Sequence, residues 1–82
     1  LKAADIQGWL ISYLSELLEI QPDEIDVEIP FERYGLSSSE GTIMIGDIEA
    51  WVGYKLAPTL VYEYPTIEVL AQHIAEEMPI LV

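Results

Sequence analysis

Apolar residues near the start of the chain recur with the period of a helix. Between residues 6 and 18 they are spaced three or four positions apart, at Ile6, Trp9, Leu10, Tyr13, Leu14, Leu17 and Leu18. An α-helix places residues with this spacing on one face. The pattern therefore predicts an amphipathic helix over about residues 4–19, whose apolar face must be covered by other elements.

Residues 38–52 are predicted to form a second amphipathic helix. Its inward face is expected to contain Met44, Ile48, Trp51 and Val52, with Gly41 and Ile45 beside it. Gly53 follows as a helix stop. Gly41 and Gly46 either weaken this helix, each by ~1 kcal/mol relative to alanine, or allow another element to approach closely, and the sequence does not distinguish the two.

The remainder of the chain predicts a short helical turn and a last helix. The turn is expected from Pro58 to about Glu63, because Pro65 disfavours helical backbone at the residue before it. Thr66 is expected to cap the last helix, whose inward residues are Ile67, Leu70, Ala71, Ile74 and Met78. No segment alternates as a strand would. The predicted fold class is therefore all-α, a small four-helix bundle with three main helices and a short third helix.

An acidic loop between Pro22 and Pro30 joins the first two helices. The apolar residues in and beside this loop are expected to fold back onto the core, and they are Ile20, Ile25, Ile29 and Phe31. The carboxylates of residues 23–28 lack the ligand spacing and the turn glycine of an EF-hand loop. The loop is therefore not predicted to bind calcium.

The chain is short and strongly acidic. Its 82 residues suffice for one domain, and fifteen Asp and Glu residues outnumber Lys2, Arg33 and Lys55 to give a net charge of −12. Nucleic acid is excluded as a partner, because phosphate binding requires clustered Lys and Arg. The acidic surface either steers the domain toward basic patches on protein partners or only maintains solubility.

Residue types also exclude several kinds of site. The chain has no cysteine, and therefore no disulfide, thiol nucleophile or Cys-ligated zinc site, which fits a cytoplasmic location. No apolar run approaches the ~20 residues that span a bilayer, so no membrane partner is expected. His73 is the single histidine, and it falls on the outer side of the last helix without a nucleophile beside it. No glycine-rich phosphate loop is present either, so the chain is not predicted to be an enzyme.

The segment Gly35-Leu36-Ser37-Ser38-Ser39-Glu40 is typical of a loop that leads into a helix. Ser37 is suited to be the N-cap, and Glu40 follows three residues later in capping-box spacing. Ser38 then becomes the first helical residue, with its hydroxyl beside the positive end of the helix. Free N–H groups and the helix dipole at that end both favour a phosphate group.

The block Phe31-Glu32-Arg33-Tyr34-Gly35-Leu36-Ser37-Ser38 resembles the attachment segment of acyl carrier proteins, particularly the carrier domains of modular polyketide synthases. That family usually shows Gly-x-Asp-Ser-Leu at this place. The likeness continues through Asp47-Ile48-Glu49-Ala50-Trp51, Leu56-Ala57-Pro58-Thr59-Leu60, Tyr64-Pro65-Thr66-Ile67 and Leu70-Ala71-Gln72-His73-Ile74. With residues 17–26 upstream, it covers nearly the whole chain in the family's order and spacing.

The resemblance implies that Ser38 carries a covalent 4′-phosphopantetheine arm, which comes from coenzyme A and holds acyl groups as thioesters. A phosphopantetheinyl transferase would attach the arm. An acyltransferase or a fatty acyl-adenylate ligase would load it, and a ketosynthase or other synthase domains would receive the acyl group. The run Gly46-Asp47-Ile48-Glu49-Ala50-Trp51 is similar to carriers that accompany fatty acyl-adenylate ligases.

The family's partner surface is the second helix and the loop before it. The resemblance therefore assigns partner docking to Arg33, Ser37, Ser39, Glu40, Ile43 and Asp47. The chain is expected to be a single acyl carrier domain over residues 1–82, cut from a larger synthase and monomeric in isolation. Its apolar tail, residues 78–82, has no obvious helix partner.

Four positions depart from the family pattern. Ser37 replaces the usual aspartate, which keeps an N-cap but removes a negative charge, and Ser39 replaces the usual leucine, which removes an apolar side chain from the rim. Ile43 and Ile45 occupy places that are often polar in the family. Either these isoleucines indicate a partner with a partly hydrophobic docking patch, or a slight rotation of the helix buries one of them.

Two other functions are alternatives at this stage. A peptidyl carrier of a non-ribosomal peptide synthetase usually shows Gly-Gly-His-Ser or Gly-Gly-Asp-Ser, where this chain has Tyr34-Gly35-Leu36 before its serines. An acidic helical interaction module without a prosthetic group is favoured by the absent aspartate. Trp9, Trp51 and the five tyrosines raise the question of a ligand pocket, but aromatic residues at helical spacing predict core packing.

Overall fold

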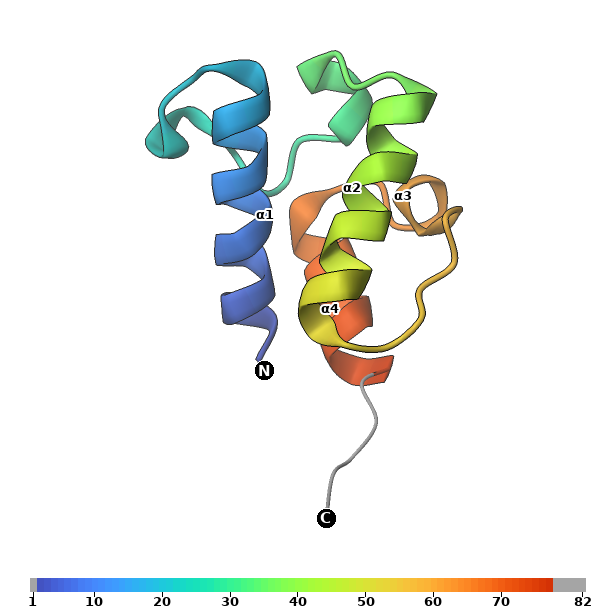
Figure 1. The fold of residues 1–82 in the computed structure, drawn as a ribbon. Helices are drawn as coiled ribbons and strands as arrows, with labels where there is room; N and C mark the ends of the chain where they lie inside the picture. The colour runs from blue at the N-terminus through green and yellow to red at the C-terminus, as the bar shows by residue number, and fades with distance from the viewer. Residues whose placement is uncertain (1, 78–82) are drawn as a thin grey trace.

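The computed structural model describes residues 2–77, which form a bundle of helices (Figure 1). Its α-helices are α1 (Ala3–Leu18), α2 (Ser38–Val52), α3 (Leu60–Glu63) and α4 (Ile67–Glu77). Two short 3-10 helices, η1 (Pro22–Glu24) and η2 (Phe31–Tyr34), lie in the connection between α1 and α2. The all-α bundle with a short third helix is confirmed, and each helix begins within two residues of its predicted start.

Each helix contributes a narrow apolar stripe to one core. The stripe of α1 repeats every four residues, and its fully buried members are Ile6, Leu10 and Leu14. The stripe of α4 consists of Ile67, Leu70, Ala71 and Ile74, and α1 packs more extensively on α4 than on any other helix. The stripe of α2 consists of Gly41, Met44, Ile45 and Ile48. Met78, which was predicted to extend the α4 stripe, lies outside the described residues.

Two residues that were predicted to face inward lie at the edge of the core. Leu17 is 39% exposed and Trp51 is 40% exposed. The buried stripe of α1 is centred on the residues spaced four apart, so Leu17 falls on its flank. The buried stripe of α2 likewise includes Ile48 but not Trp51. Trp51 lies beside the stripe and stacks on Trp9 of α1.

The connection between α1 and α2 is fixed to the start of α4. The Phe31 amide donates to the Pro65 carbonyl at 2.8 Å, and the Glu68 amide donates to the Val27 carbonyl at 3.0 Å. An isolated antiparallel bridge joins Pro30 to Thr66, and residues 2–77 contain no longer strand. These bonds bring the apolar residues of the loop inward. Ile25 and Phe31 are buried, as predicted for this loop.

The two helix glycines of α2 have different surroundings. A Cβ at Gly41 would stand 3.2 Å from Val61 Cγ1 of α3, whereas a Cβ at Gly46 would have no neighbour within 4 Å. Close approach therefore explains Gly41 but not Gly46. Gly53 ends α2 in the left-handed region at φ 86°, which confirms it as the helix stop.

No helix among residues 2–77 has both the length and the apolar character needed to cross a membrane. Over the same residues, no group of three or more His, Asp or Glu side chains is arranged to hold a metal ion.

Candidate functional site

The chain reaches the start of α2 through a tight reversal after η2. Gly35 ends η2 with φ 80°, a conformation that favours glycine because a side chain would be strained there. The hydroxyl of Tyr34 accepts from the Asp26 amide at 2.7 Å and donates to the Asp26 carbonyl at 2.9 Å. These bonds tie the end of η2 to the loop before it, and the chain then turns at Gly35 into α2.

A capping box starts α2. Ser37 is the N-cap with extended backbone, and its Oγ accepts from the Glu40 amide at 3.1 Å. The Glu40 carboxylate in turn accepts from the Ser37 amide at 2.9 Å. These reciprocal bonds confirm the capping box expected from the sequence, and they occupy the Ser37 hydroxyl as an acceptor.

Ser38 is the first helical residue of α2, and its side chain is exposed. The amides of Ser38 and Ser39 stand at the first two helical positions, where helix geometry provides no acceptor within the helix. The threonine one turn later, Thr42, donates from Oγ1 to the Ser38 backbone carbonyl at 3.0 Å, a bond that does not involve the Ser38 hydroxyl. A phosphate on Ser38 would meet free N–H groups and the positive end of the helix dipole.

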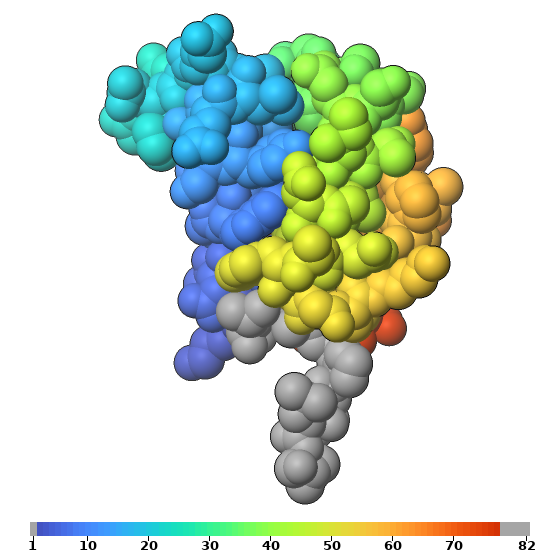
Figure 2. All heavy atoms as spheres, in the orientation of Figure 1, coloured from blue at the N-terminus to red at the C-terminus, as the bar shows by residue number. Residues whose placement is uncertain are grey.

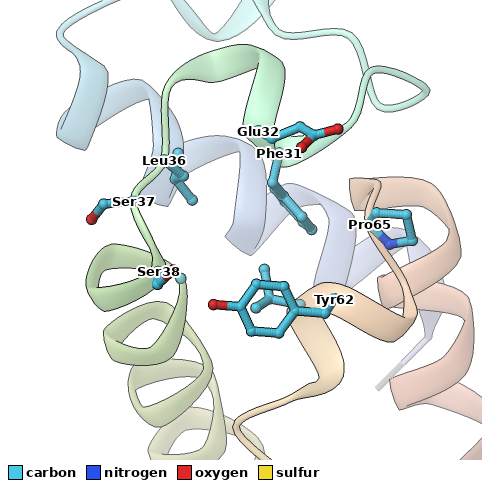
Figure 3. A pocket seen from close by; sticks show the side chains of 9 residues that line it. Phe31, Glu32, Leu36, Ser37, Ser38, Tyr62 and Pro65 are labelled. Carbon is cyan, nitrogen blue, oxygen red and sulfur yellow. The ribbon is translucent and has the colours of Figure 1, made fainter.

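A pocket of ≈ 330 Å³ opens beside Ser38 (Figure 3). It is lined by Phe31, Glu32, Leu36, Ser37, Ser38, Gly41, Val61, Tyr62 and Pro65. Phe31 points into it from η2, and the ring of Tyr62 lies across from Ser38 with its hydroxyl toward the serine. Thus η2, the first turns of α2, and α3 together form a partly apolar recess next to an exposed alcohol.

Gly41 lets α3 form one wall of this pocket. Its missing side chain allows the buried Val61 to lie directly against the α2 backbone. Tyr62 follows Val61 in sequence and is exposed, and this packing of α3 places it in the pocket lining. A residue inside α2 therefore shapes the surroundings of Ser38 without contacting it.

The six residues assigned to docking all lie on η2 or α2 or directly before α2, but their surroundings differ. Exposed side chains belong to Arg33, Ser37, Ser39, Ile43 and Asp47. Glu40 is half-buried and is used by the capping box. Ile43 is 59% exposed, whereas Ile45 is buried with 1% exposure. Of the two isoleucines in places that are often polar, the helix buries Ile45 and presents Ile43.

Asp47 faces α1 as well as solvent. The pKa of the Tyr13 hydroxyl is raised to about 12, chiefly by burial, then by a hydrogen bond with the Asp47 carboxylate and the charge of that carboxylate, with a smaller effect from Glu40. An anion beside a phenol disfavours the phenolate because the two negative charges repel. Asp47 therefore interacts with α1 and is not a wholly free docking residue.

Two residues beside the site were not anticipated. Tyr62 and Phe31 reach the pocket from elements remote from Ser38 in sequence, and no local pattern pairs them with a serine. The sequence contains one indirect indication for Tyr62. Leu60 and Val61 face inward, so the residue that follows them lies on the outer side of α3. His73 was predicted on the outer side of α4, but it is half-buried and stacks on Tyr64 with ring centroids 4.0 Å apart. The short turn after α3 folds Tyr64 back onto α4 and covers the imidazole.

The family model described as "Phosphopantetheine attachment site" matches residues 8–74. The chain is 34% identical over 73 residues to the acyl carrier protein TtuC of Teredinibacter turnerae, with 89% of this chain and 84% of that protein covered. It is 33% identical over 76 residues to one of the phenolphthiocerol/phthiocerol polyketide synthase proteins of Mycobacterium tuberculosis. That match covers 93% of this chain and only 4% of the synthase protein.

A solved structure shares both the fold and much of the sequence. It is the solution structure of an acyl carrier protein from Anabaena sp. PCC 7120, described as having a variant phosphopantetheinylation-site sequence. The TM-score is 0.86 and the identity 43%, with 92% of this chain and 85% of that chain covered. The family model extends from α1 to α4, and these likenesses span most of the chain. The protein therefore belongs to the phosphopantetheine-attachment family, as a non-catalytic acyl carrier domain whose cofactor is a covalently bound 4′-phosphopantetheine.

Proposed function

We propose that Ser38 is the attachment residue and that the domain carries acyl intermediates in a polyketide-type assembly line. The observation that supports this most directly is the position of Ser38, exposed at the first helical residue of α2 and beside a pocket. A hydroxyl buried in the bundle would be out of reach of a modifying enzyme. The exposed Ser38 hydroxyl meets that requirement.

The three adjacent serines have different roles in this proposal. Ser37 accepts the Glu40 amide, so its hydroxyl serves the helix cap. Ser39 is exposed but does not line the pocket, whereas Ser38 does. Ser38 therefore has a hydroxyl that does not serve the helix cap, and it lines the pocket. Both features favour Ser38 over its two neighbours as the attachment residue.

The residues around Ser38 fit a phosphodiester. The free amides at the start of α2 would donate hydrogen bonds to its oxygens, and the helix dipole would stabilise its charge. Leu36, Val61 and Phe31 supply apolar surface next to it. When bound, the arm supplies a terminal thiol that holds an acyl group as a thioester. Tethering raises the effective concentration of that acyl group at each partner.

Partners are proposed to dock on η2 and α2. The proposed contacts are Arg33, Ser37, Ser39, Glu40, Ile43 and Asp47, and the partners are a phosphopantetheinyl transferase, a loading acyltransferase or fatty acyl-adenylate ligase, and a ketosynthase or other synthase domains. The exposed Ile43 supports a docking patch that is partly hydrophobic. The likeness to a polyketide synthase protein supports this kind of assembly line, and the absence of cysteine from the sequence supports a cytoplasmic setting.

The altered sequence around Ser38 does not argue against modification. Ser37 replaces the family's aspartate, but it forms the same N-cap with a side-chain acceptor. The similar Anabaena protein is itself described as having a variant phosphopantetheinylation-site sequence. We therefore propose that the cap, rather than the negative charge, is what this position must retain.

Incubation with coenzyme A and a broad-specificity phosphopantetheinyl transferase tests the proposal. Intact mass should increase by one phosphopantetheine group, and peptide mapping should place it on Ser38. Ser38→Ala should abolish the increase, while Ser12→Ala, an exposed serine of α1 outside the proposed docking contacts, is the control and should retain it. Circular dichroism of each variant verifies that the helices are intact.

Two outcomes would contradict the proposal. Modification of Ser37 or Ser39 would move the attachment residue. No increase with several transferases, in a protein of intact helicity, would favour an acidic interaction module without an arm. The modified domain is then offered to an enzyme that loads acyl groups and to one that loads amino acids. Loading by the first alone identifies an acyl carrier, and loading by the second alone identifies a peptidyl carrier.

A further inference from the structure

Two tryptophans stack across the seam between α1 and α2. The rings of Trp9 and Trp51 have centroids 5.7 Å apart and planes inclined by 20°, and Tyr13 continues the stack on Trp9 at 5.1 Å and 16°. These three residues are called the indole platform below. The two helices run antiparallel and side by side, so the end of α2 lies beside the first half of α1 (Figure 1). Figure 2 shows both helices on one face of the molecule.

The indole platform is more exposed than core packing requires. The fully buried side chains of α1 and α2 are aliphatic or thioether groups, and neither tryptophan is among them. Trp51 is 40% exposed, and Trp9 and Tyr13 are half-buried. Tryptophan is highly buried on average in folded proteins, so an indole exposed to this degree has aromatic surface available to an external group.

Each tryptophan has a carboxylate one helical turn before it. Asp5 precedes Trp9 by four residues and Asp47 precedes Trp51 by four residues, and both carboxylates are exposed. Residues at this spacing have Cβ atoms about 5–6 Å apart on the helix surface. Each carboxylate precedes its tryptophan in an antiparallel helix, so Asp5 and Asp47 lie toward opposite ends of the stacked pair. Asp5 also accepts the Lys2 amide with one oxygen, and Asp47 acts on the Tyr13 hydroxyl.

We propose that the indole platform is a docking site for an arginine side chain on a basic surface of a protein partner. A guanidinium group stacks on an aromatic face and at the same time donates hydrogen bonds to a carboxylate. An ammonium group has no plane to stack, so arginine fits this arrangement better than lysine does. The charge is also complementary, since the chain carries a net charge of −12.

The indole platform lies at the other end of α2 from Ser38, and Asp47 is the one residue that this arginine site shares with the docking contacts proposed above. Trp51 lies thirteen residues after Ser38 on the same helix, which corresponds to about 20 Å along the axis. A partner held on the indole platform would leave the start of α2 accessible. The platform would therefore tether a neighbouring protein, while the Ser38 end of the helix meets the enzymes that modify or use the arm.

The test uses the Ser38→Ala protein, so that its result does not depend on the arm. The probe is the peptide acetyl-Leu-Arg-Gly-Arg-Leu-amide, and its control has citrulline in place of both arginines, which keeps the shape and removes the charge. The indole N–H signals of Trp9 and Trp51 are followed by NMR during titration. Both signals should shift to saturation, and the citrulline peptide should bind about two- to fivefold more weakly, as expected for a cation–π contact at an exposed site.

Three variants decide the location. Trp51→Ala should remove the arginine preference, and Asp47→Asn should reduce it while leaving the stack in place. Tyr62→Ala is the matched control, because Tyr62 is an aromatic residue with 59% exposure on α3, away from the platform. Equal binding of the two peptides, no shift with either peptide, or an arginine preference that survives both Trp51→Ala and Asp47→Asn would overturn the proposal. If Trp51→Ala does not fold by circular dichroism, Asp47→Asn alone decides.

Discussion

Gly41 of α2 lies against the side chain of Val61 of α3, so closely that a Cβ on Gly41 would stand 3.2 Å from Val61 Cγ1. This contact sets the separation of the two helices at the pocket beside Ser38. Alanine is the better helix former by about 1 kcal/mol, but its methyl group would have to displace a buried valine. Two glycines of one helix are therefore expected to respond differently to the same substitution.

Gly46→Ala should raise the free energy of unfolding by about 0.5–1 kcal/mol, because a Cβ there has no neighbour within 4 Å. Gly41→Ala should gain nothing or lose stability, since overpacking offsets the gain in helix propensity. Urea denaturation measures both. In the double variant Gly41→Ala/Val61→Ala, the free energy of unfolding should be higher than the sum of the two single effects predicts. Strictly additive effects would show that the Gly41–Val61 contact is not the cause of the loss.

Ser37→Ala should lower the free energy of unfolding by about 1 kcal/mol, because it removes the acceptor for the Glu40 amide. Ser37→Asp should preserve stability, because a carboxylate caps the helix equally well. Thermal denaturation followed by circular dichroism gives the comparison. Ser39→Ala is the control and should fall within about 0.5 kcal/mol of the parent protein. A destabilisation of equal size in Ser39→Ala would assign the effect to lost polarity rather than to the cap.

Ile43→Glu should slow transfer to or from partner enzymes while leaving the free energy of unfolding within about 0.5 kcal/mol of the parent, because Ile43 is 59% exposed. Ile45→Glu is the matched contrast. Ile45 is 1% exposed, so the same change would bury an unpaired carboxylate and should cost several kcal/mol. Loading kinetics and urea denaturation are measured on both. Partner kinetics identical to the parent in Ile43→Glu would remove this residue from the docking surface.

Tyr13 should be among the last tyrosines to ionise in an alkaline titration. Burial, followed by the Asp47 carboxylate, raises its pKa from 10.0 to about 12. The folded-state pKa lies above the unfolded value, so the stability contributed by the neutral hydroxyl is complete below pH 10 and is lost as the pH rises through about 12. Ultraviolet phenolate absorbance of the protein and of Tyr13→Phe gives the difference. Asp47→Asn should lower this pKa, and a Tyr13 transition near 10 in the parent would contradict the assignment.

Tyr54→Phe should destabilise the protein by about 1 kcal/mol, because its hydroxyl donates to the Ile74 carbonyl at 2.8 Å in a partly buried place. This bond fixes the segment after α2 to α4. Tyr62→Phe is the control, since Tyr62 is exposed and its hydroxyl should contribute little to folding. Equal unfolding midpoints for the two variants in urea would show that the Tyr54 bond does not stabilise the fold.

Local patterns predicted the helices and the start of α2, because these depend on residues close in sequence. Helical spacing, Pro65, Gly53 and the Ser37–Glu40 pair each act within one or two turns of backbone. The exposure of Ser38 follows from the same local geometry, since the first helical residue projects from the helix end.

Contacts between remote elements could not be predicted in the same way. Helical spacing gives the direction of a side chain, but the width of the buried stripe depends on which neighbour covers it. Leu17 and Trp51 were for this reason expected in the core and lie at its edge. The approach of Tyr62 to Ser38 depends on how α3 packs on Gly41, and the His73–Tyr64 stack depends on the turn between α3 and α4.

The hydrogen bond from the Phe31 amide to the Pro65 carbonyl joins two sides of the Ser38 pocket across 34 residues of sequence. Since Phe31 and Pro65 both line the recess, this bond ties the η2 part of its wall to the residues that lead into α4. Another part of the wall is formed by Tyr62, on a helix of only four residues. The recess is therefore expected to be more adjustable at Tyr62 than between Phe31 and Pro65.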